Sequence, residues 1–121
     1  MILGFKEQFI PKVIDGTKIH TLREGERWRQ DMSIQFYGNV RTPEMYKFRE
    51  DGLCTGVQEV FMTLDWVLEI SIDDRYLMPF EIDQFIKNDG FEERKEFQNF
   101  FFPEKVDFVK RQLVHWTDFR Y

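Results

Sequence analysis

The sequence predicts one α+β domain, built from a mainly antiparallel, curled sheet or small β-barrel with helices packed against it. Its 121 residues are 42% hydrophobic and 17% aromatic, which is enough for one hydrophobic core. No internal repeat and no linker rich in Pro, Gly or Ser divides residues 1–121. The expected order is strand, helix, four or five strands, two helices and strand. This order has too few crossover helices for a parallel α/β sheet.

The N-terminal part predicts a strand, a short helix and a second strand. Residues 1–5 form a short apolar strand, and residues 8–16 have the apolar spacing of a helix. Pro11 suits the first turn of this helix, and Gly16 suits a left-handed C-terminal cap. Residues 17–23, TKIHTLR, then predict a strand, because β-branched residues recur in it, but one that is unusually polar.

Strands also dominate the middle of the chain. Residues 32–38 read as a strand and residues 40–52 as a loop or ragged hairpin. Two further strands follow over residues 54–64 and 65–73, where apolar residues recur with a period near two. Their core candidates are Val57, Val60, Phe61, Val67, Leu68, Ile70 and Ile72.

Two helices and a strand complete the prediction. The helices span residues 78–88 and 91–102, with Pro103 stopping the second, and the last strand spans residues 111–121. The phenylalanine-rich runs LMPF and FFF are expected in the core, because exposed aromatic patches of that size promote aggregation. The residues of the second helix expected to point inward are Phe97, Phe100 and Phe101.

Composition limits the classes of function. The formal net charge of −5 argues against coating nucleic acid by bulk electrostatics. Residues 1–49 hold nine basic and six acidic residues, net +3, whereas residues 50–121 are net −8. An anion-binding surface should therefore be local and N-terminal, unless these charges scatter over the folded surface.

Targeting and metal signals are weak in this sequence. No run has the length of a membrane span, and the first residues lack the features of a signal peptide, so we expect a cytoplasmic protein and no membrane partner. Cys54 is the single cysteine and has no metal-ligand spacing around it, so we expect it to be buried or half-buried. His20 and His115 are far apart in the sequence, which makes a metal site improbable.

Residues 16–23 concentrate the polar chemistry of the chain. Thr21 and Arg23 share one strand face by period two, so Lys18 joins them only through a bulge or a strand that begins after it. A desolvated lysine beside an arginine has a lowered pKa and can accept a proton. A threonine hydroxyl can act as nucleophile, and the arginine can hold an anion or oxyanion. The alternative is a surface strand with a salt bridge or two.

The run Gly16-Thr17-Lys18-Ile19-His20-Thr21-Leu22-Arg23 resembles the G-x-K-x-x-T-x-R motif of ASCH domains, a family of the PUA-like superfamily. The expected element order is also similar over nearly the whole chain. The resemblance implies a PUA-like β-barrel over residues 1–121, with a cleft lined by the motif and RNA or modified nucleosides as ligands. One branch of small ASCH proteins removes the acetyl group of N4-acetylcytidine, using the motif lysine, the motif threonine and a glutamate of the later helical region. No metal or organic cofactor is then required.

Carried over residue by residue, the resemblance makes Lys18 and Thr21 catalytic and places Asp89 at the position of the glutamate, one methylene shorter. Asp89 has an alternative structural role, because it can cap the turn at Gly90 and the start of the next helix. The sequence leaves open whether Asp89 or another acid completes the site. The other candidates are Glu69, Glu92 and Glu93.

Further residues are candidates for substrate binding. Glu24 and Trp28 follow the motif in a loop that could flank the cleft, where Trp28 stacks on a base or simply packs. Tyr37 offers a hydroxyl at the end of its strand, and Arg23 gives electrostatic support. His20 falls on the alternate strand face and is either a cleft residue or an ordinary packed histidine. Three further arginines either contact phosphates of a ligand or are solvated surface charges. They are Arg27, Arg29 and Arg41.

Three functions fit these observations. In the first, Lys18 is the general base of an amide hydrolysis on a nucleoside, Thr21 is the nucleophile or positions the substrate, and Asp89 is their carboxylate partner. In the second, the same pocket only recognises RNA, in RNA metabolism or translation control. In the third, the phenylalanine-rich helices make the chain a protein-interaction domain.

Overall fold

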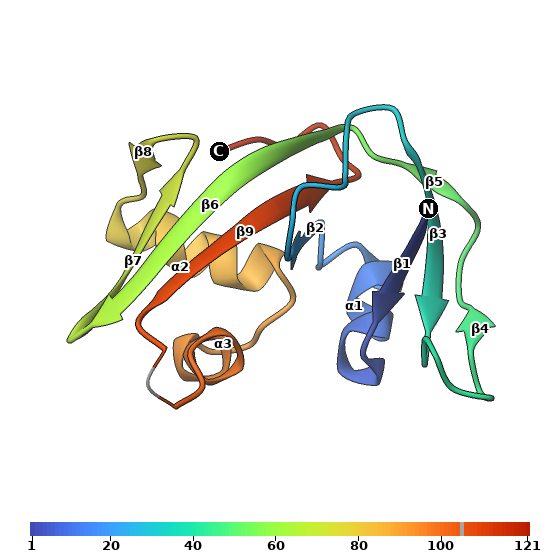
Figure 1. Cartoon of the computed structure of the whole chain (residues 1–121), viewed down its shortest axis with the longest axis horizontal. Coiled ribbons are helices and arrows are strands. Elements are labelled where there is room, and N and C mark those ends of the chain that lie inside the picture. Colours follow the sequence, from blue (N-terminus) through green and yellow to red (C-terminus); the bar gives the residue numbers. More distant parts are fainter. Residues whose placement is uncertain (105) are drawn as a thin grey trace.

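The strands of this protein form two sheets. The computed structural model describes residues 1–104 and 106–121, and in it three α-helices and two mostly antiparallel sheets make an α+β fold (Figure 1). The expected mixture of elements is therefore confirmed. The expected closed barrel is not: within the described ranges, the ladders of one sheet share no strand with those of the other.

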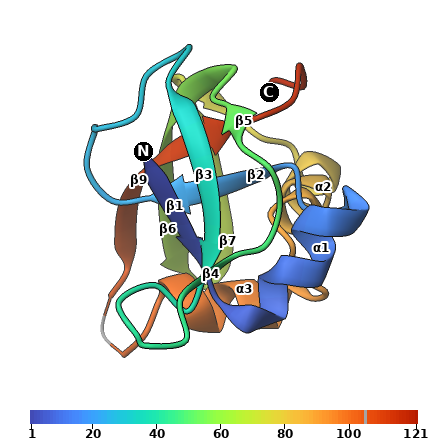
Figure 2. The ribbon, with the colours of Figure 1, turned by 90° about the vertical axis from the view of Figure 1, so that its right-hand side faces the viewer.

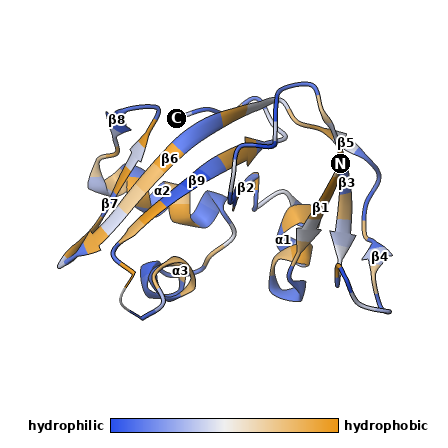
Figure 3. Ribbon diagram, in the orientation of Figure 1, coloured by the Kyte–Doolittle hydropathy of each residue, from blue (hydrophilic) through white to orange (hydrophobic). Residues whose placement is uncertain are grey.

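The larger sheet has five strands and is antiparallel throughout. The residues of its long central strand are alternately buried and more exposed, as expected for a sheet with one face on a core. Both polar and apolar residues occur along this strand (Figure 3). The strands, in spatial order, are β2 (His20–Arg23), β9 (Phe108–His115), β6 (Gly56–Asp65), β7 (Val67–Ile72) and β8 (Arg75–Tyr76).

The smaller sheet contains the first strand of the chain. β1 (Ile2–Phe5) pairs in parallel with β3 (Ser33–Gly38), and two short strands pair antiparallel with β3. These are β4 (Tyr46–Lys47) and β5 (Gly52–Leu53), which lie in the segment expected to be a loop or ragged hairpin.

The helices fill the space beside the two sheets. A 3-10 helix, η1 (Glu7–Phe9), leads into α1 (Ile10–Asp15), and this pair follows β1 directly. Helices α2 (Pro79–Asn88) and α3 (Arg94–Phe101) lie together on one side of the larger sheet, and α1 lies in front of α2 in the second view (Figures 1 and 2). The Ile19 N–H donates to the carbonyl of Asn88, the last residue of α2, at 2.9 Å. The end of α2 therefore faces the segment that follows α1.

Aromatic side chains make up much of the core around these helices. Phe85 and Phe97 are fully buried and join α2 to α3 through an edge contact of 5.9 Å between ring centroids. Cys54 is fully buried, as expected. In the described ranges, no helix combines the length and apolar character needed to cross a membrane.

Several boundaries and burial predictions were wrong. The last strand begins three residues earlier than expected and ends at His115, because its long partner β6 continues the ladder. The second C-terminal helix begins only at Arg94. Val67 is 53%, Phe80 is 72% and Phe100 is 40% exposed, so the apolar pattern overstated the core at these positions.

Candidate functional site

Lys18 reaches the protein interior because β2 begins after it. Helix α1 ends at Gly16, whose φ of +84° is left-handed as expected for a C-terminal cap. The backbone N–H of Lys18 donates to the carbonyl of Lys12, at an N to O distance of 2.9 Å, so the chain turns back on the helix before β2 starts at His20. Lys18 therefore precedes the strand and does not follow its alternation of faces. This is the second of the two alternatives that the sequence allowed, a bulge or a strand that begins after Lys18.

The Lys18 amine is enclosed. The residue is 2% exposed, and its Nζ donates to the backbone oxygen of Asp89 at 2.5 Å and lies 3.4 Å from the Asp89 carboxylate oxygen Oδ1. Burial lowers the pKa of Lys18 to about 8, with a smaller lowering by Arg23, while the Asp89 charge opposes the shift. An amine with this pKa is partly neutral near physiological pH and can accept a proton.

A small pocket of about 90 Å³ gathers the predicted chemical groups. This volume suits a few water molecules or one small planar group, and we call it the inner pocket. Its polar wall consists of Lys6, Lys18, Thr21, Arg23 and Asp89. Its remaining wall is largely aromatic, formed by Phe5, Phe9, Phe91, Phe100 and Phe101.

Thr21 and Arg23 enter the inner pocket from the same strand, as period two predicts. Thr21 is 6% exposed, and no hydrogen bond of its hydroxyl is found among residues 1–104 and 106–121. Arg23 donates from Nη2 to the carbonyl of Gly4 at 2.6 Å, whereas its buried Nε has no partner in the same ranges. Burial lowers the pKa of Arg23 to about 10, well above neutral pH, so the guanidinium keeps its charge.

Asp89 comes to the site from the end of α2. It occupies the C-cap position of that helix, and its carboxylate accepts from Lys18 and lies 3.1 Å from Nδ1 of His20. The expected cap on the next helix is not formed by this side chain, because α3 begins only after Glu93. The other candidate acids, Glu69 and Glu92 among them, are exposed, and none of them lines the inner pocket.

Gly90 leaves room for the Lys18 side chain. Its φ is +95°, and a Cβ atom there would lie 2.9 Å from Cδ of Lys18 and 3.1 Å from a ring carbon of Phe9. A side chain at this position would therefore combine backbone strain with crowding of the lysine.

Replacing Gly90 with alanine is expected to lower the free energy of unfolding by about 2–3 kcal/mol, measured by urea denaturation. Gly25→Ala is the matched control: its φ is +79°, but a Cβ there meets nothing within 4 Å. The control should lose only the strain, about 1–2 kcal/mol. Equal losses in the two variants would show that crowding against Lys18 contributes nothing.

The residues expected to flank the cleft do not line the inner pocket itself. His20 is fully buried and contacts Asp89 instead of lining the inner pocket. Trp28 is 4% exposed and packs in the core, although it also lines a second, wider groove beside the inner pocket. Tyr37 is half-buried on β3 and does not line the inner pocket. The Glu24 side chain is 84% exposed and pairs with Arg111 at 3.4 Å.

A wider groove of about 720 Å³ adjoins the inner pocket. The two share four lining residues, which are Gly4, Phe5, Lys6 and Arg23. Two acidic and four basic residues line the groove. The acidic ones are Glu7 and Glu24, and the basic ones are Lys6, Arg23, Arg27 and Arg41. The basic N-terminal half of the sequence therefore contributes a local surface of net positive charge.

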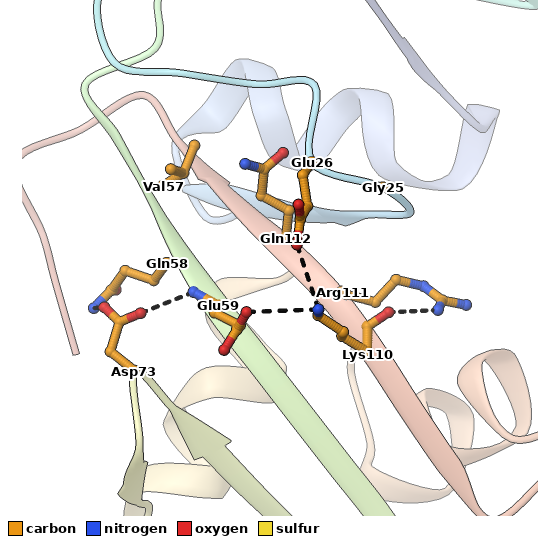
Figure 4. Close-up of a pocket in the computed structure, with 9 residues that line it drawn as sticks. All are labelled: Gly25, Glu26, Val57, Gln58, Glu59, Asp73, Lys110, Arg111 and Gln112. Atoms are coloured by element: carbon orange, nitrogen blue, oxygen red, sulfur yellow. Dashed lines mark hydrogen bonds and ion pairs between the residues drawn. The ribbon is translucent and has the colours of Figure 1, made fainter.

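A second large pocket, of about 570 Å³, lies over β6 and β9 and contains none of the predicted site residues (Figure 4). Its charges pair with one another: Lys110 Nζ lies 3.3 Å from Glu26 and 3.7 Å from Glu59. Asp73 accepts hydrogen bonds from the backbone of Glu59 and the amide of Gln58. These groups are occupied by contacts with one another. The pocket also lacks a buried amine such as Lys18 of the inner pocket.

The two histidines are neighbours, although the sequence suggested that they are far apart. The register of β2 and β9 places His20 opposite His115, with ring centroids 5.4 Å apart. In the described ranges, they do not belong to any group of three or more residues able to hold a metal ion. Burial lowers the pKa of His20, and it lowers that of His115 to about 3, so both rings are neutral at physiological pH.

Tyr121 and Asn88 are site neighbours that the sequence did not indicate. The Tyr121 hydroxyl lies 2.5 Å from Nε2 of His20, and Asn88 Nδ2 donates to the same hydroxyl at 3.0 Å. Local spacing carries no signal for a contact between residues that are 101 positions apart.

Comparisons with protein-family models, curated proteins and solved structures found no significant match to this chain.

Proposed function

We propose that this protein is an ASCH-like, PUA-related amidohydrolase that removes an acyl group from the exocyclic amine of a nucleoside or RNA base, with N4-acetylcytidine as the model substrate. One observation carries the proposal: the amine of Lys18 is buried, with a lowered pKa, in the same small pocket as Thr21, Arg23 and Asp89. Burying an amine is unfavourable, and such sites are enriched in catalytic groups.

The sizes of the two cavities fit a substrate whose acyl amide binds in one cavity and whose remaining part binds in the other. The inner pocket, at about 90 Å³, is too small for a nucleoside but suits an acyl amide and the adjoining edge of a base. The remaining part of the nucleoside would lie in the groove of about 720 Å³, which shares the Arg23 wall. The basic residues of this groove are compatible with a phosphate on the sugar.

The proposed reaction consumes one water. Neutral Lys18 accepts the proton of the nucleophile, which is the Thr21 hydroxyl or a water held by it, as a C–O bond forms at the acyl carbon. The oxyanion that develops is stabilised by the charge of Arg23. The C–N bond then breaks, and Lys18 returns the proton to the leaving amine. If Thr21 is acylated, water hydrolyses the ester, so both routes give cytidine and acetate.

Asp89 has a supporting role in this proposal. Its backbone oxygen and carboxylate both contact the Lys18 amine, which fixes the direction of the nitrogen lone pair. Its negative charge also raises the pKa of Lys18 against the effect of burial. The amine thus stays close to the range in which it can both take and return a proton.

Incubation with N4-acetylcytidine, followed by ultraviolet spectroscopy and acetate detection, tests the proposal. We expect turnover without added metal or cofactor. Binding without turnover would favour a recognition module for RNA. Neither binding nor turnover, with nucleosides and short RNAs, would leave the protein-interaction function, although Phe97 and Phe101, on one of the helices meant to supply that surface, are buried.

A further inference from the structure

Behind the inner pocket, a chain of polar contacts leads from the buried Asp89 toward the surface. The carboxylate lies 3.1 Å from Nδ1 of His20, and Nε2 on the other side of the same ring lies 2.5 Å from the hydroxyl of Tyr121. Asn88 Nδ2 donates to that hydroxyl at 3.0 Å, and Gln84 Nε2 donates to Asn88 Oδ1 at 2.8 Å. Segments far apart in the sequence are therefore joined by one chain of polar contacts.

The direction of the protons follows from the chemistry of the groups. A carboxylate only accepts, so Nδ1 of His20 carries the proton that is donated to Asp89. The neutral ring then has a lone pair at Nε2, which accepts from the Tyr121 hydroxyl. The hydroxyl oxygen in turn accepts from Asn88, so each donor in the chain has one acceptor and a single tautomer of His20 satisfies all of them.

We propose that Tyr121 is a positioning residue, which acts through His20 to hold the Asp89 carboxylate against Lys18. The inference rests on the proposed function for its consequence in catalysis, but its structural part concerns only these four groups. Tyr121 does not line the inner pocket, so its influence must pass through His20 and Asp89.

Tyr121 is itself held in place by its backbone. The Gln58 amide donates to the Tyr121 carbonyl and accepts from the Tyr121 N–H, both at 3.2 Å. His115 Nε2 also donates to Gln58 Oε1, at 3.0 Å, which orients the amide. The ring packs against Phe85 with centroids 5.2 Å apart. The hydroxyl is thus presented to His20 by contacts that do not depend on it.

Loss of the hydroxyl would leave Nε2 of His20 as a buried acceptor without a partner. The ring could then move its proton to Nε2 or rotate, and Asp89 would lose one of its two side-chain donors. A carboxylate held only by Lys18 has more freedom to turn away from the amine. The expected consequence is a weaker influence of Asp89 on Lys18.

The variant Tyr121→Phe tests the proposal, because it removes one oxygen and keeps the packing. With N4-acetylcytidine we expect kcat to fall by about tenfold and KM to stay within about twofold, since the hydroxyl does not touch substrate. Tyr76→Phe is the matched control: the same atom is removed from a residue that is 70% exposed, and no change is expected.

Nitrogen NMR of His20 and of the Lys18 amine gives a readout that needs no substrate. Tyr121→Phe should lower the proton occupancy of His20 Nδ1 and lower the pKa of Lys18, and Asn88→Ala should do the same to a smaller extent. These shifts in a protein without turnover would support the positioning role while the proposed function fails. An unchanged His20 tautomer together with an unchanged Lys18 titration in Tyr121→Phe would overturn the inference.

Discussion

Replacing Lys18 with methionine is expected to lower kcat/KM for N4-acetylcytidine by about three orders of magnitude, the usual contribution of a general base. Methionine fills a similar volume, so the core should remain packed while the proton acceptor is lost. Steady-state kinetics measure the loss, and circular dichroism checks that the fold is kept.

Lys12→Met is the matched control for this variant. Lys12 lies next to the site, where its Nζ donates to the carbonyl of Gly90 at 2.9 Å and pairs with Glu92 at 2.6 Å, but it does not line the inner pocket. Its activity should stay within about threefold of the unmodified protein. A Lys18→Met protein that folds and keeps its activity would exclude Lys18 as the base.

The pH profile is the second large effect, because only the neutral amine can accept a proton. With the pKa of Lys18 lowered to about 8, log kcat/KM should rise with pH and level off above pH 8. If the pH of this break moves by one unit, the neutral fraction of the Lys18 amine at any pH below the break changes about tenfold. The charged groups that act on the amine are Asp89, Arg23 and Lys12.

Two substitutions should move the break in opposite directions. Asp89→Asn removes a charge that raises the pKa of Lys18, so the break should move to lower pH. Arg23→Gln removes a charge that lowers this pKa, so the break should move to higher pH, with a further loss of kcat from the missing oxyanion support. Breaks that move together, or that stay in place, would mean that Lys18 is not the titrating group.

The same pKa makes a prediction for stability. An unfolded lysine keeps its ordinary pKa of 10.5, so between about pH 8 and 10.5 the unfolded chain binds more protons than the folded one. The free energy of unfolding should therefore rise with pH across this window, and Lys18→Met should abolish that part of the rise. This measurement checks the burial of the amine even without a substrate.

Much of the local structure could be predicted because its causes are local. The cap at Gly16 needs only a residue that tolerates positive φ, and the shared face of Thr21 and Arg23 needs only period two. The short motif of residues 16–23 could thus be read as chemistry before any contact was known. Val67 and Phe80 show the limit, since their apolar character did not bury them.

The sequence by itself determined the α+β class, the main order of helices and strands, and the position of a lysine, a threonine and an arginine just after a helix cap. Only the tertiary structure decided that the strands form two sheets, that Asp89 and not Glu69 or Glu92 meets the lysine, and that Tyr121 lies against His20. The physical reason is the range of the interactions. Caps and strand periods depend on neighbours in the chain, whereas desolvation of Lys18 and the contacts of Asp89 depend on packing between segments about 70 residues apart, which no local pattern encodes.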